Sequence, residues 1–305
     1  MRALAVHTDV IVVVSSVWQT TCTAVRAGDE GFLIDSPVLP DELDALPSLL
    51  EQAGFPVNGL LATHGDWDHV LARLAFPEAP LGAGEATARR LTEEVGEPQR
   101  RLREFDAEWY IDGRRPLALG SVQSLPVPGR LSIGSQGGTP GRGGALPEDA
   151  GGTAGGTGGG EAGGTGGGEA GGTGGGAEGG EIEVYPADGH TADGVAYWLP
   201  WASVLVCGDY LSPAEIPMIS AQSGGTHDAY RETLLRLAPL VERAELVIPG
   251  HGTPLSSQRA RTLLGEDIAY LDALAAGGDE IPLPEGRRSA TQKRIHAENL
   301  AALGR

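Results

Sequence analysis

The sequence predicts an α+β fold: an αββα sandwich in which two mixed β-sheets pack face to face and helices cover their outer sides. Two observations predict it. β-rich segments followed by helical segments occur twice along the chain, and such elements must bury their apolar faces against one another. At 305 residues, the chain is also long enough to bury a sizeable core. We therefore expect residues 1–305 to form one domain.

The N-terminal half is expected to build the first sheet and its helices. β-branched residues bounded by turn-forming glycines mark its strands. Asp41 and Glu42 favour a helix start, because acidic side chains stabilise the N-terminus of a helix. The expected strands are 10–17, 21–27, 31–35 and 57–63, and the expected helices are 41–53, 70–75, 85–95 and 97–109.

The C-terminal half repeats the order of strands followed by helices. Residues 121–133 are expected to be extended, and 182–209 should hold two or three strands. Pro239 lacks a backbone N–H, so it should end or kink the helix in which it lies. The remaining expected elements are a strand at 246–248 and helices at 227–243, 256–276 and 289–303.

Residues 134–181 interrupt this pattern with a glycine-rich repeat. The eight residues Ala-Gly-Gly-Thr-Gly-Gly-Gly-Glu at 154–161 recur at 162–169. Glycine at this density loses much backbone entropy on ordering and has no side chain to bury. We expect a flexible insert in a surface loop of the domain, outside the functional machinery.

Charge narrows the range of partners. The chain has 22 basic and 41 acidic residues, a formal net charge of −19. Such a field repels nucleic acid, so a small-molecule substrate is expected instead. Lys293 is the only lysine, and it lies in the predicted C-terminal helix, which argues against a Schiff-base or phosphate-loop lysine. The sequence does not decide between a monomer and a homo-oligomer.

Cysteine usage and hydropathy predict a cytoplasmic protein. Cys22 and Cys207 are too few for a disulfide framework, and each is expected to be a buried apolar residue with a free thiol. The apolar run 10–14 is too short to span a membrane, and it has neither the basic stretch nor the cleavage pattern of a secretory signal.

One six-residue segment carries most of the functional information. His64-Gly65-Asp66-Trp67-Asp68-His69 places two imidazoles and two carboxylates directly after an apolar run. This donor set suits zinc, iron or manganese. In an extended chain, residues i and i+2 point the same way, so His64 and Asp66 can share one face. Asp68 and His69 would face a second position at the start of a short helix, and one loop could serve two metals.

Three further candidate ligands lie at predicted strand ends. His190, Asp209 and His251 each follow a β-rich run and stand beside glycines that permit a sharp turn. Functional groups concentrate at such positions because the sheet holds the loops in place.

The order of these motifs resembles the metallo-β-lactamase-fold hydrolase superfamily, from about the first strands to Gly252. The resemblance implies the αββα metallo-β-lactamase fold and two divalent metal ions, zinc before iron or manganese. It implies that Asp35 supports the metal loop and that Asp68 also takes part in proton transfer. By the resemblance, the first metal belongs to His64, Asp66 and His190, the second belongs to Asp68, His69 and His251, and Asp209 bridges them.

Asp66 departs from the family pattern, which has histidine at this position. Two divalent metals carry +4 and the carboxylates of Asp66, Asp68 and Asp209 carry −3, which leaves +1, where histidine at position 66 would leave +2. A less positive site activates water less and prefers a harder metal. Di-iron relatives carry glutamate at the corresponding position, so a carboxylate there is compatible with metal binding, although aspartate is one methylene shorter.

The function expected is that of a metal-dependent hydrolase. A metal-bound hydroxide would cleave an ester, lactone or thioester-type bond in a small molecule. Two alternatives stay open: a di-iron redox protein of the same fold, suggested by the carboxylate at position 66, and a non-catalytic binding protein with a degenerate metal site. Trp67 would either form a substrate wall or cover the metal loop.

Overall fold

The computed structural model describes residues 1–133, 180–277 and 281–305. Within these residues the strands form a seven-stranded sheet in the order β1 to β7 and a six-stranded sheet in the order β13 to β8. The first sheet consists of β1 (Arg2–His7), β2 (Val10–Val14), β3 (Thr21–Ala27), β4 (Glu30–Asp35), β5 (Gly59–Ala62), β6 (Leu81–Gly84) and β7 (Val122–Leu125). The second consists of β8 (Gly129–Ile133), β9 (Gly180–Pro186), β10 (Val195–Leu199), β11 (Val204–Val206), β12 (Leu246–Ile248) and β13 (Leu255–Ser256).

Both sheets are mixed. In the first, β1 to β4 pair in antiparallel fashion, whereas β4 to β7 pair in parallel. In the second, β11 and β12 are parallel and the other neighbours are antiparallel. The helices are α1 (Pro40–Gln52), α2 (Ala72–Ala75), α3 (Glu85–Glu93), α4 (Glu97–Glu108), α5 (His227–Arg243), α6 (Ser257–Ala276) and α7 (Ala290–Ala302), with short 3₁₀ turns η1 (Trp67–His69), η2 (Pro200–Ala202) and η3 (Ala221–Ser223).

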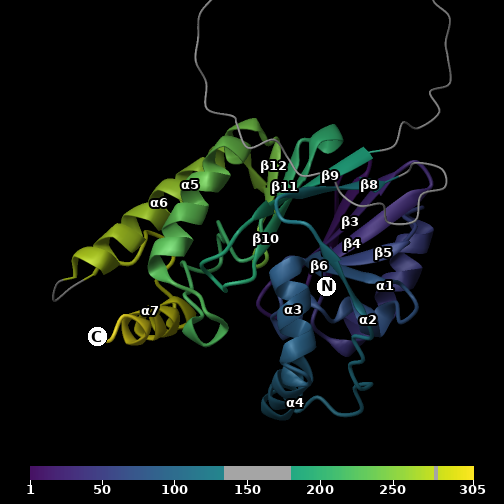
Figure 1. Cartoon of the computed structure of the whole chain (residues 1–305), viewed down its shortest axis with the longest axis horizontal. Coiled ribbons are helices and arrows are strands. Elements are labelled where there is room, and N and C mark those ends of the chain that lie inside the picture. Colours follow the sequence, from purple (N-terminus) through teal and green to yellow (C-terminus); the bar gives the residue numbers. More distant parts are fainter. Residues whose placement is uncertain (134–179, 278–280) are drawn as a thin grey trace, which may run out of the picture.

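The burial of apolar side chains produces four layers of helices and sheets. In Figure 1 they run from α5 and α6, through the two sheets, to α1 and α2. Strand β2 illustrates the pattern: Val10, Val12 and Val14 face the second sheet, whereas Ile11 and Val13 face the helices of the N-terminal half. A strand buried on both faces is uniformly apolar, as β2 is. The predicted αββα sandwich is confirmed.

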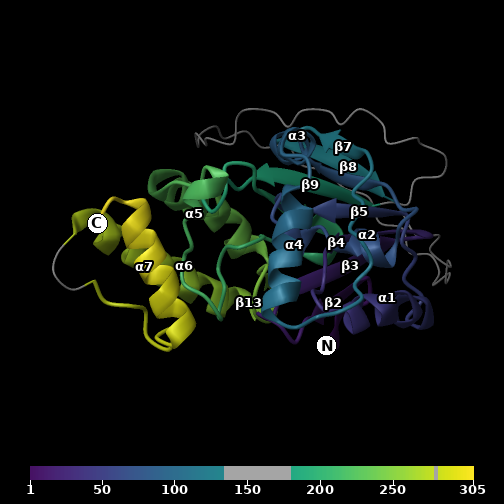
Figure 2. The same cartoon turned by 90° about the horizontal axis from the view of Figure 1, so that it is seen from below.

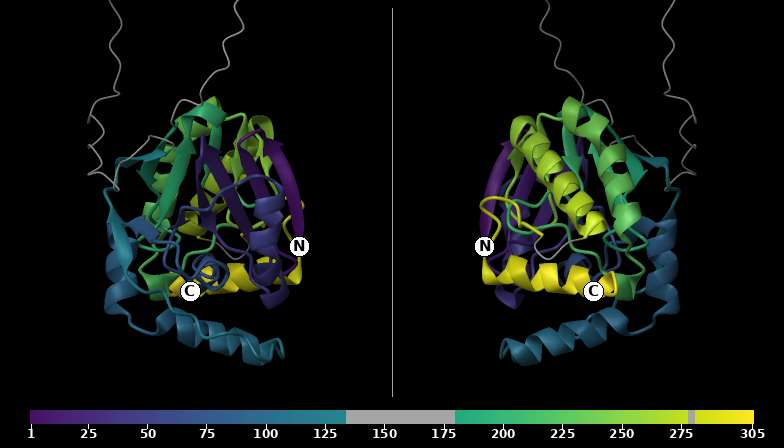
Figure 3. Two further views of the ribbon diagram at one scale, coloured as in Figure 1. Left: turned by 90° about the vertical axis from the view of Figure 1, so that its right-hand side faces the viewer. Right: turned by 90° about the vertical axis from the view of Figure 1, so that its left-hand side faces the viewer.

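The helices divide between the two outer faces. Figure 2 shows α1 to α4 beside the strands of the N-terminal half of the chain and α5 to α7 beside the strands of the C-terminal half. The right-hand view of Figure 3 looks onto α5 and α6, with α7 running across one end of them. Helix α6 begins where Ser256 Oγ accepts the backbone N–H of Arg259, and Thr226 caps α5 in the same way through Ala229.

The structure corrects several details of the sequence reading. Helix α5 has the expected bounds, 227–243, but it does not end at Pro239 as the proline alone would suggest. Its buried residues lie on both sides of the proline (Leu234, Leu237, Leu240 and Val241), and this packing outweighs the loss of one helical hydrogen bond. Strands β1 and β6 were not expected. Strand β1 lacks a clear alternation of polar and apolar residues, and β6 is short and reads Leu-Gly-Ala-Gly.

The structure corrects the end of the glycine-rich insert, which was expected at residue 181. Gly180 and Glu181 belong to β9, where they pair with Ile133 and Ser132 of β8. The rest of the expected insert, 134–179, lies outside the described residues. Cys22 and Cys207 are both buried free thiols, as expected. No helix of the described residues has the length and apolar character needed to cross a membrane.

Candidate metal centre

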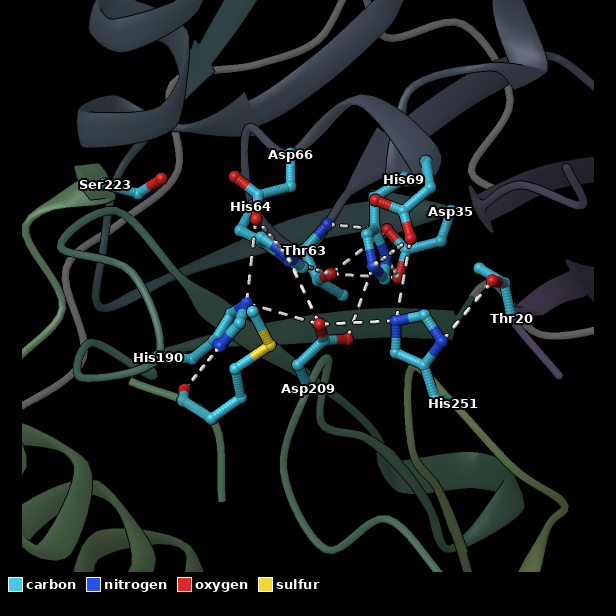
Figure 4. Close-up of polar contacts among 12 residues, drawn as sticks. Thr20, Asp35, Thr63, His64, Asp66, His69, His190, Asp209, Ser223 and His251 are labelled. Carbon is cyan, nitrogen blue, oxygen red and sulfur yellow. Dashed lines mark hydrogen bonds and ion pairs between the residues drawn. The ribbon is translucent and has the colours of Figure 1, made fainter. Parts of the chain in front are cut away.

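The candidate ligands meet at the ends of strands from both sheets. His64 follows β5, the loop after it continues into η1 with Asp68 and His69, and Asp209 and His251 follow β11 and β12. Figure 4 shows the side chains converging, with Asp209 between His64 and His190 on one side and His69 and His251 on the other. The structure therefore brings together all of the side chains that the sequence singled out: His64, Asp66, Asp68, His69, His190, Asp209 and His251.

The first group of donors forms around Asp66 and two imidazoles. Asp66 Oδ2 lies 3.7 Å from His64 Nε2 and 3.7 Å from His190 Nε2. Asp209 Oδ2 lies 3.8 Å and 3.3 Å from the same two nitrogens. These separations leave room for a metal ion between the donors, whose bonds to zinc measure about 2.0–2.2 Å.

The second group forms around Asp68. Its Oδ2 lies 3.8 Å from His69 Nε2 and 3.6 Å from His251 Nε2. Asp209 contributes here as well, with Oδ1 at 3.3 Å from His69 Nε2 and Oδ2 at 3.4 Å from His251 Nε2. Asp209 thus contacts both groups, in the position that a bridging carboxylate requires.

Hydrogen bonds on the far side of the rings aim the Nε2 atoms inward. His190 Nδ1–H donates to the carbonyl of Met218 at 2.7 Å, and His251 Nδ1–H donates to the carbonyl of Trp18 at 3.2 Å. His69 Nδ1 lies 3.0 Å from Asp35 Oδ2. Outer partners of this kind fix the orientation of metal-binding histidines.

Asp35 supports the metal loop, as the resemblance implied. It lies at the end of β4 and accepts the backbone N–H of Thr63 at 2.8 Å and the Thr63 hydroxyl at 2.9 Å. The Thr63 oxygen lies 3.1 Å from His64 Nδ1. Asp35 has a φ of +60°, a strained backbone conformation for a residue with a side chain. One carboxylate therefore positions His69 directly and His64 through Thr63.

The donor set fits divalent metal ions. Within the described residues, Nε2 of His64, His69 and His190 and Oδ1 of Asp209 are buried without a hydrogen-bond partner. A buried polar atom left unpaired is costly, so four of them aimed at one space call for a ligand. Imidazole and carboxylate donors suit zinc, iron or manganese.

The charges of the site are strongly coupled. Burial alone would lower the pKa of His190 and His251, but Asp209 and neighbouring carboxylates raise it, to about 9 for His190 and about 10 for His251. Burial likewise opposes ionisation of Asp209 and Asp66, yet the surrounding imidazoles, and Arg90 beside Asp66, hold the pKa of both carboxyls below the ordinary value. Burial and His69 lower the pKa of His64.

Glycine at position 250 keeps the centre open. A Cβ at Gly250 would lie 2.1 Å from Asp209 Oδ1 and 3.0 Å from His69 Cε1. A side chain there would push the shared carboxylate and an imidazole out of place. The glycine that directly precedes His251 is therefore required by the donors themselves.

Sequence reasoning missed two residues that support the site. Arg90 on α3 contacts Asp66, with Nη2 2.7 Å from Oδ1. Asp193, three residues after His190, accepts the N–H of Gly65 at 2.9 Å and pairs with Arg90 at 3.0 Å. The signal for Asp193 was its place in the loop after His190, but nothing in the local sequence of α3 distinguished Arg90 from Arg89.

Trp67 packs in an aromatic cluster rather than among the donors. Its ring lies 5.7 Å from that of Trp18 and 4.8 Å from that of Phe105 on α4. It covers the metal loop on the side of α4. His227 bonds to the carbonyl of Leu271 on α6 and to its neighbour Asp228, so its contacts lie away from the centre.

Comparison with known proteins shows which family the chain matches. The profile of the family described as the metallo-beta-lactamase superfamily matches residues 15–251, more than half of the chain. No curated protein matches the sequence.

Solved structures share the fold at low sequence identity. The metallo-beta-lactamase from Pontibacter korlensis has a TM-score of 0.53 and 15% identity over 89% of this chain and 98% of its own. BLEG-1 B3 metallo-beta-lactamase has a TM-score of 0.54 and 17% identity over 82% of this chain and 95% of its own. TTHA1623 in a di-iron-bound form has a TM-score of 0.51 and 18% identity over 82% of this chain and 96% of its own. At such identities the likeness concerns the fold alone.

Proposed function

Because the chain belongs to the metallo-β-lactamase superfamily, we propose that it is a metal-dependent hydrolase with two divalent metal ions, zinc in both positions. The observation that carries the proposal is the position of Asp209 between two groups of donors. His64, Asp66 and His190 would hold one ion, Asp68, His69 and His251 the other, and Asp209 both.

The bond cleaved would be an ester, lactone or thioester of a small molecule. Metals held in this way activate water as a nucleophile and polarise the carbonyl oxygen under attack. The protein contributes the geometry: Asp35 and the carbonyls behind the imidazoles hold the donors before substrate arrives. Asp68 would accept a proton from the attacking water through its free carboxylate oxygen and deliver it to the leaving group.

A hydrolysis screen tests the proposal. Lactone, thioester, phosphodiester and β-lactam panels are assayed with protein loaded with Zn²⁺, Mn²⁺ or Fe²⁺. We expect turnover of a carbonyl ester class with Zn²⁺ and loss of that turnover in His69→Ala. His7→Ala serves as the matched control, since His7 lies on β1 and contacts Asp9, outside the centre. Activity retained in His69→Ala would overturn the assignment.

Asp66 supports a second candidate, a di-iron redox protein. A carboxylate beside His64 and His190 is a harder donor than the family's histidine. A fold relative binds two irons in its solved structure. Two iron ions per chain with a visible charge-transfer band, and no hydrolysis across the panels, would favour this candidate.

A further inference from the structure

A half-buried arginine contacts the one donor that departs from the family pattern. We propose that Arg90 is a positioning residue that makes Asp66 a metal ligand, and that Asp193 holds Arg90 in place. The proposal rests on the proposed function, because it concerns the metal held by His64, Asp66 and His190.

The two carboxylate oxygens of Asp66 have different contacts. Its Nη2 donates to Asp66 Oδ1 at 2.7 Å. The other oxygen, Oδ2, faces His64 Nε2 and His190 Nε2, each at 3.7 Å. A carboxylate fixed at one oxygen presents the other as a single-atom donor. The side chain of aspartate is shorter than that of glutamate. Whether Oδ2 of Asp66 reaches a metal therefore depends more strongly on the orientation of the carboxylate.

The arginine is itself held on several sides. It bonds Asp193 Oδ1 at 3.0 Å, Ser223 Oγ at 3.0 Å and Glu94 Oε2 at 3.3 Å. Figure 4 shows Ser223 on the side of Asp66, away from His251. With the bond to Asp66, these bonds engage most of the five N–H donors of a guanidinium, and the side chain is only 14% exposed. Arg90 is therefore engaged by the protein and is not presented to a substrate.

Asp193 ties this arrangement to the metal loop. Its Oδ2 accepts the backbone N–H of Gly65, the residue between His64 and Asp66, at 2.9 Å. Its backbone carbonyl accepts the Thr87 hydroxyl of α3 at 2.7 Å. A Cβ at Gly65 would lie 2.9 Å from Asp193 Oδ2, so the loop needs glycine there to approach this closely. Through Thr87 and Arg90, helix α3 therefore connects the loop that follows β5 with the loop that follows β9.

Charge gives the arrangement a second role. Asp66 in place of a neutral imidazole removes one unit of positive charge from the centre. Arg90 supplies a positive charge in contact with Asp66 and partly offsets the change. Asp193 contacts a different nitrogen of the same guanidinium, Nη1. Because Asp193 and Glu94 also bind this guanidinium, the offset is partial, and the main role of Arg90 is to orient Asp66.

The test compares Arg90→Gln with Arg90→Lys and with a matched control, Arg89→Gln, an exposed arginine on the same helix. Zinc affinity is measured by competition with a chelator, and the Co²⁺-substituted protein is examined by absorption spectroscopy. In Arg90→Gln we expect the affinity for one of two metals to fall by about 10- to 100-fold, as for other outer partners of metal ligands. Arg90→Lys should recover part of the loss and Arg89→Gln should match wild type.

A double-mutant cycle shows whether Arg90 acts through Asp66. In the Asp66→Ala background, Arg90→Gln should cause no further loss of zinc affinity and no further change in the Co²⁺ spectrum. Additive losses would overturn the proposal, because Arg90 would then act on the fold. Unchanged affinity in Arg90→Gln, with two metals in wild type, would overturn the Arg90 proposal alone. Fewer than two metals in wild type would overturn the proposed function and this proposal with it.

Discussion

Asp209 stands in contact with both groups of candidate ligands, so one substitution there acts on the whole centre. Asp209→Asn keeps the shape of the side chain and removes its charge. Loss of a residue that only hydrogen-bonds to a metal ligand lowers metal affinity by roughly 10- to 100-fold. For Asp209→Asn we expect a larger fall in zinc affinity, at both positions. Metal content measured after dialysis checks this. Asp272→Asn, an exposed change on α6, is the control, and retention of both metals by Asp209→Asn would exclude a bridging role.

Gly250 gives a steric test of the same centre. Gly250→Ala would place a methyl group 2.1 Å from Asp209 Oδ1, so we expect loss of metal binding. Gly265→Ala on α6 is the matched control. Nothing lies within 4 Å of its added Cβ, and alanine favours a helix over glycine by about 1 kcal/mol. Zinc content and thermal unfolding measure both effects. Normal zinc content in Gly250→Ala would contradict the tight approach.

Metal affinity should rise with pH. In the metal-free protein the pKa of His190 is raised to about 9 and that of His251 to about 10, so both are protonated near neutrality. This protonation stabilises the metal-free fold below about pH 6.5, and the contribution is lost as pH rises through 9–10. Metal must displace these protons.

We therefore expect the apparent Kd for Zn²⁺ to fall from about pH 6 to about pH 8, with proton release on binding. Titration of the chelator-treated protein with Zn²⁺, in weak buffer containing a pH indicator, measures both. Binding without proton release would show that the imidazoles are neutral in the metal-free protein.

The ligands themselves could be predicted from the sequence because each belongs to a short local pattern. Four of them lie within 64–69, and the other three follow strand-like runs beside glycines. Arg90 could not be predicted in this way. Its partner Asp193 is 103 residues away in sequence, and α3 carries two adjacent arginines of which the fold selects one.

At the scale of elements, a buried ion pair joins α6 to the segment before α7. Arg287 is 1% exposed, and its Nη1 lies 2.6 Å from Asp267 Oδ1. Its guanidinium also bonds Glu266 and the backbone carbonyl of Glu215, in the segment that follows Asp209. Burial raises the pKa of Asp267 to about 7, while Arg287 opposes that shift. The ion pair therefore connects the C-terminal helices to a loop next to the metal centre.

Removing one member of this pair should be costly. Arg287→Met leaves Asp267 buried without its partner, and we expect the free energy of unfolding to fall by about 3–5 kcal/mol. Arg288→Met, an exposed neighbour, should change it by less than about 0.5 kcal/mol. Urea unfolding of both variants provides the comparison. Equal stability of the two would mean that the buried pair contributes nothing.

Elements were predictable where a regular pattern extends over many residues, as in α1, α5 and α6. They were not predictable where tertiary context decides. Strand β6 is short and half glycine, and it is a strand because β5 and β7 pair with both of its edges. Pro239 would end an isolated helix, yet packing on both sides carries α5 past it.

For the whole molecule, the sandwich explains why the centre lies where it does. Strand ends of both sheets meet at one edge, and backbone bonds lock the two halves there, with Thr21 N–H donating to the carbonyl of Gly250 at 2.7 Å. The order of strands followed by helices predicted the layers. It could not predict which strand is a neighbour of which, because pairings such as β11 with β12 join segments separated by a whole helix.

The glycine-rich insert should be dispensable. Ile133 of β8 pairs directly with Gly180 of β9, so a two-residue Asn-Gly turn could replace 134–179 and close a hairpin. We expect the shortened protein to keep its zinc content and its unfolding midpoint. Loss of either would assign the insert a part in the folded domain.

Elemental analysis of wild-type protein purified without added metal tests the proposed zinc hydrolase. We expect two zinc ions per chain. One ion or none would contradict the binuclear centre, and two iron ions would contradict the zinc hydrolase in favour of the redox alternative.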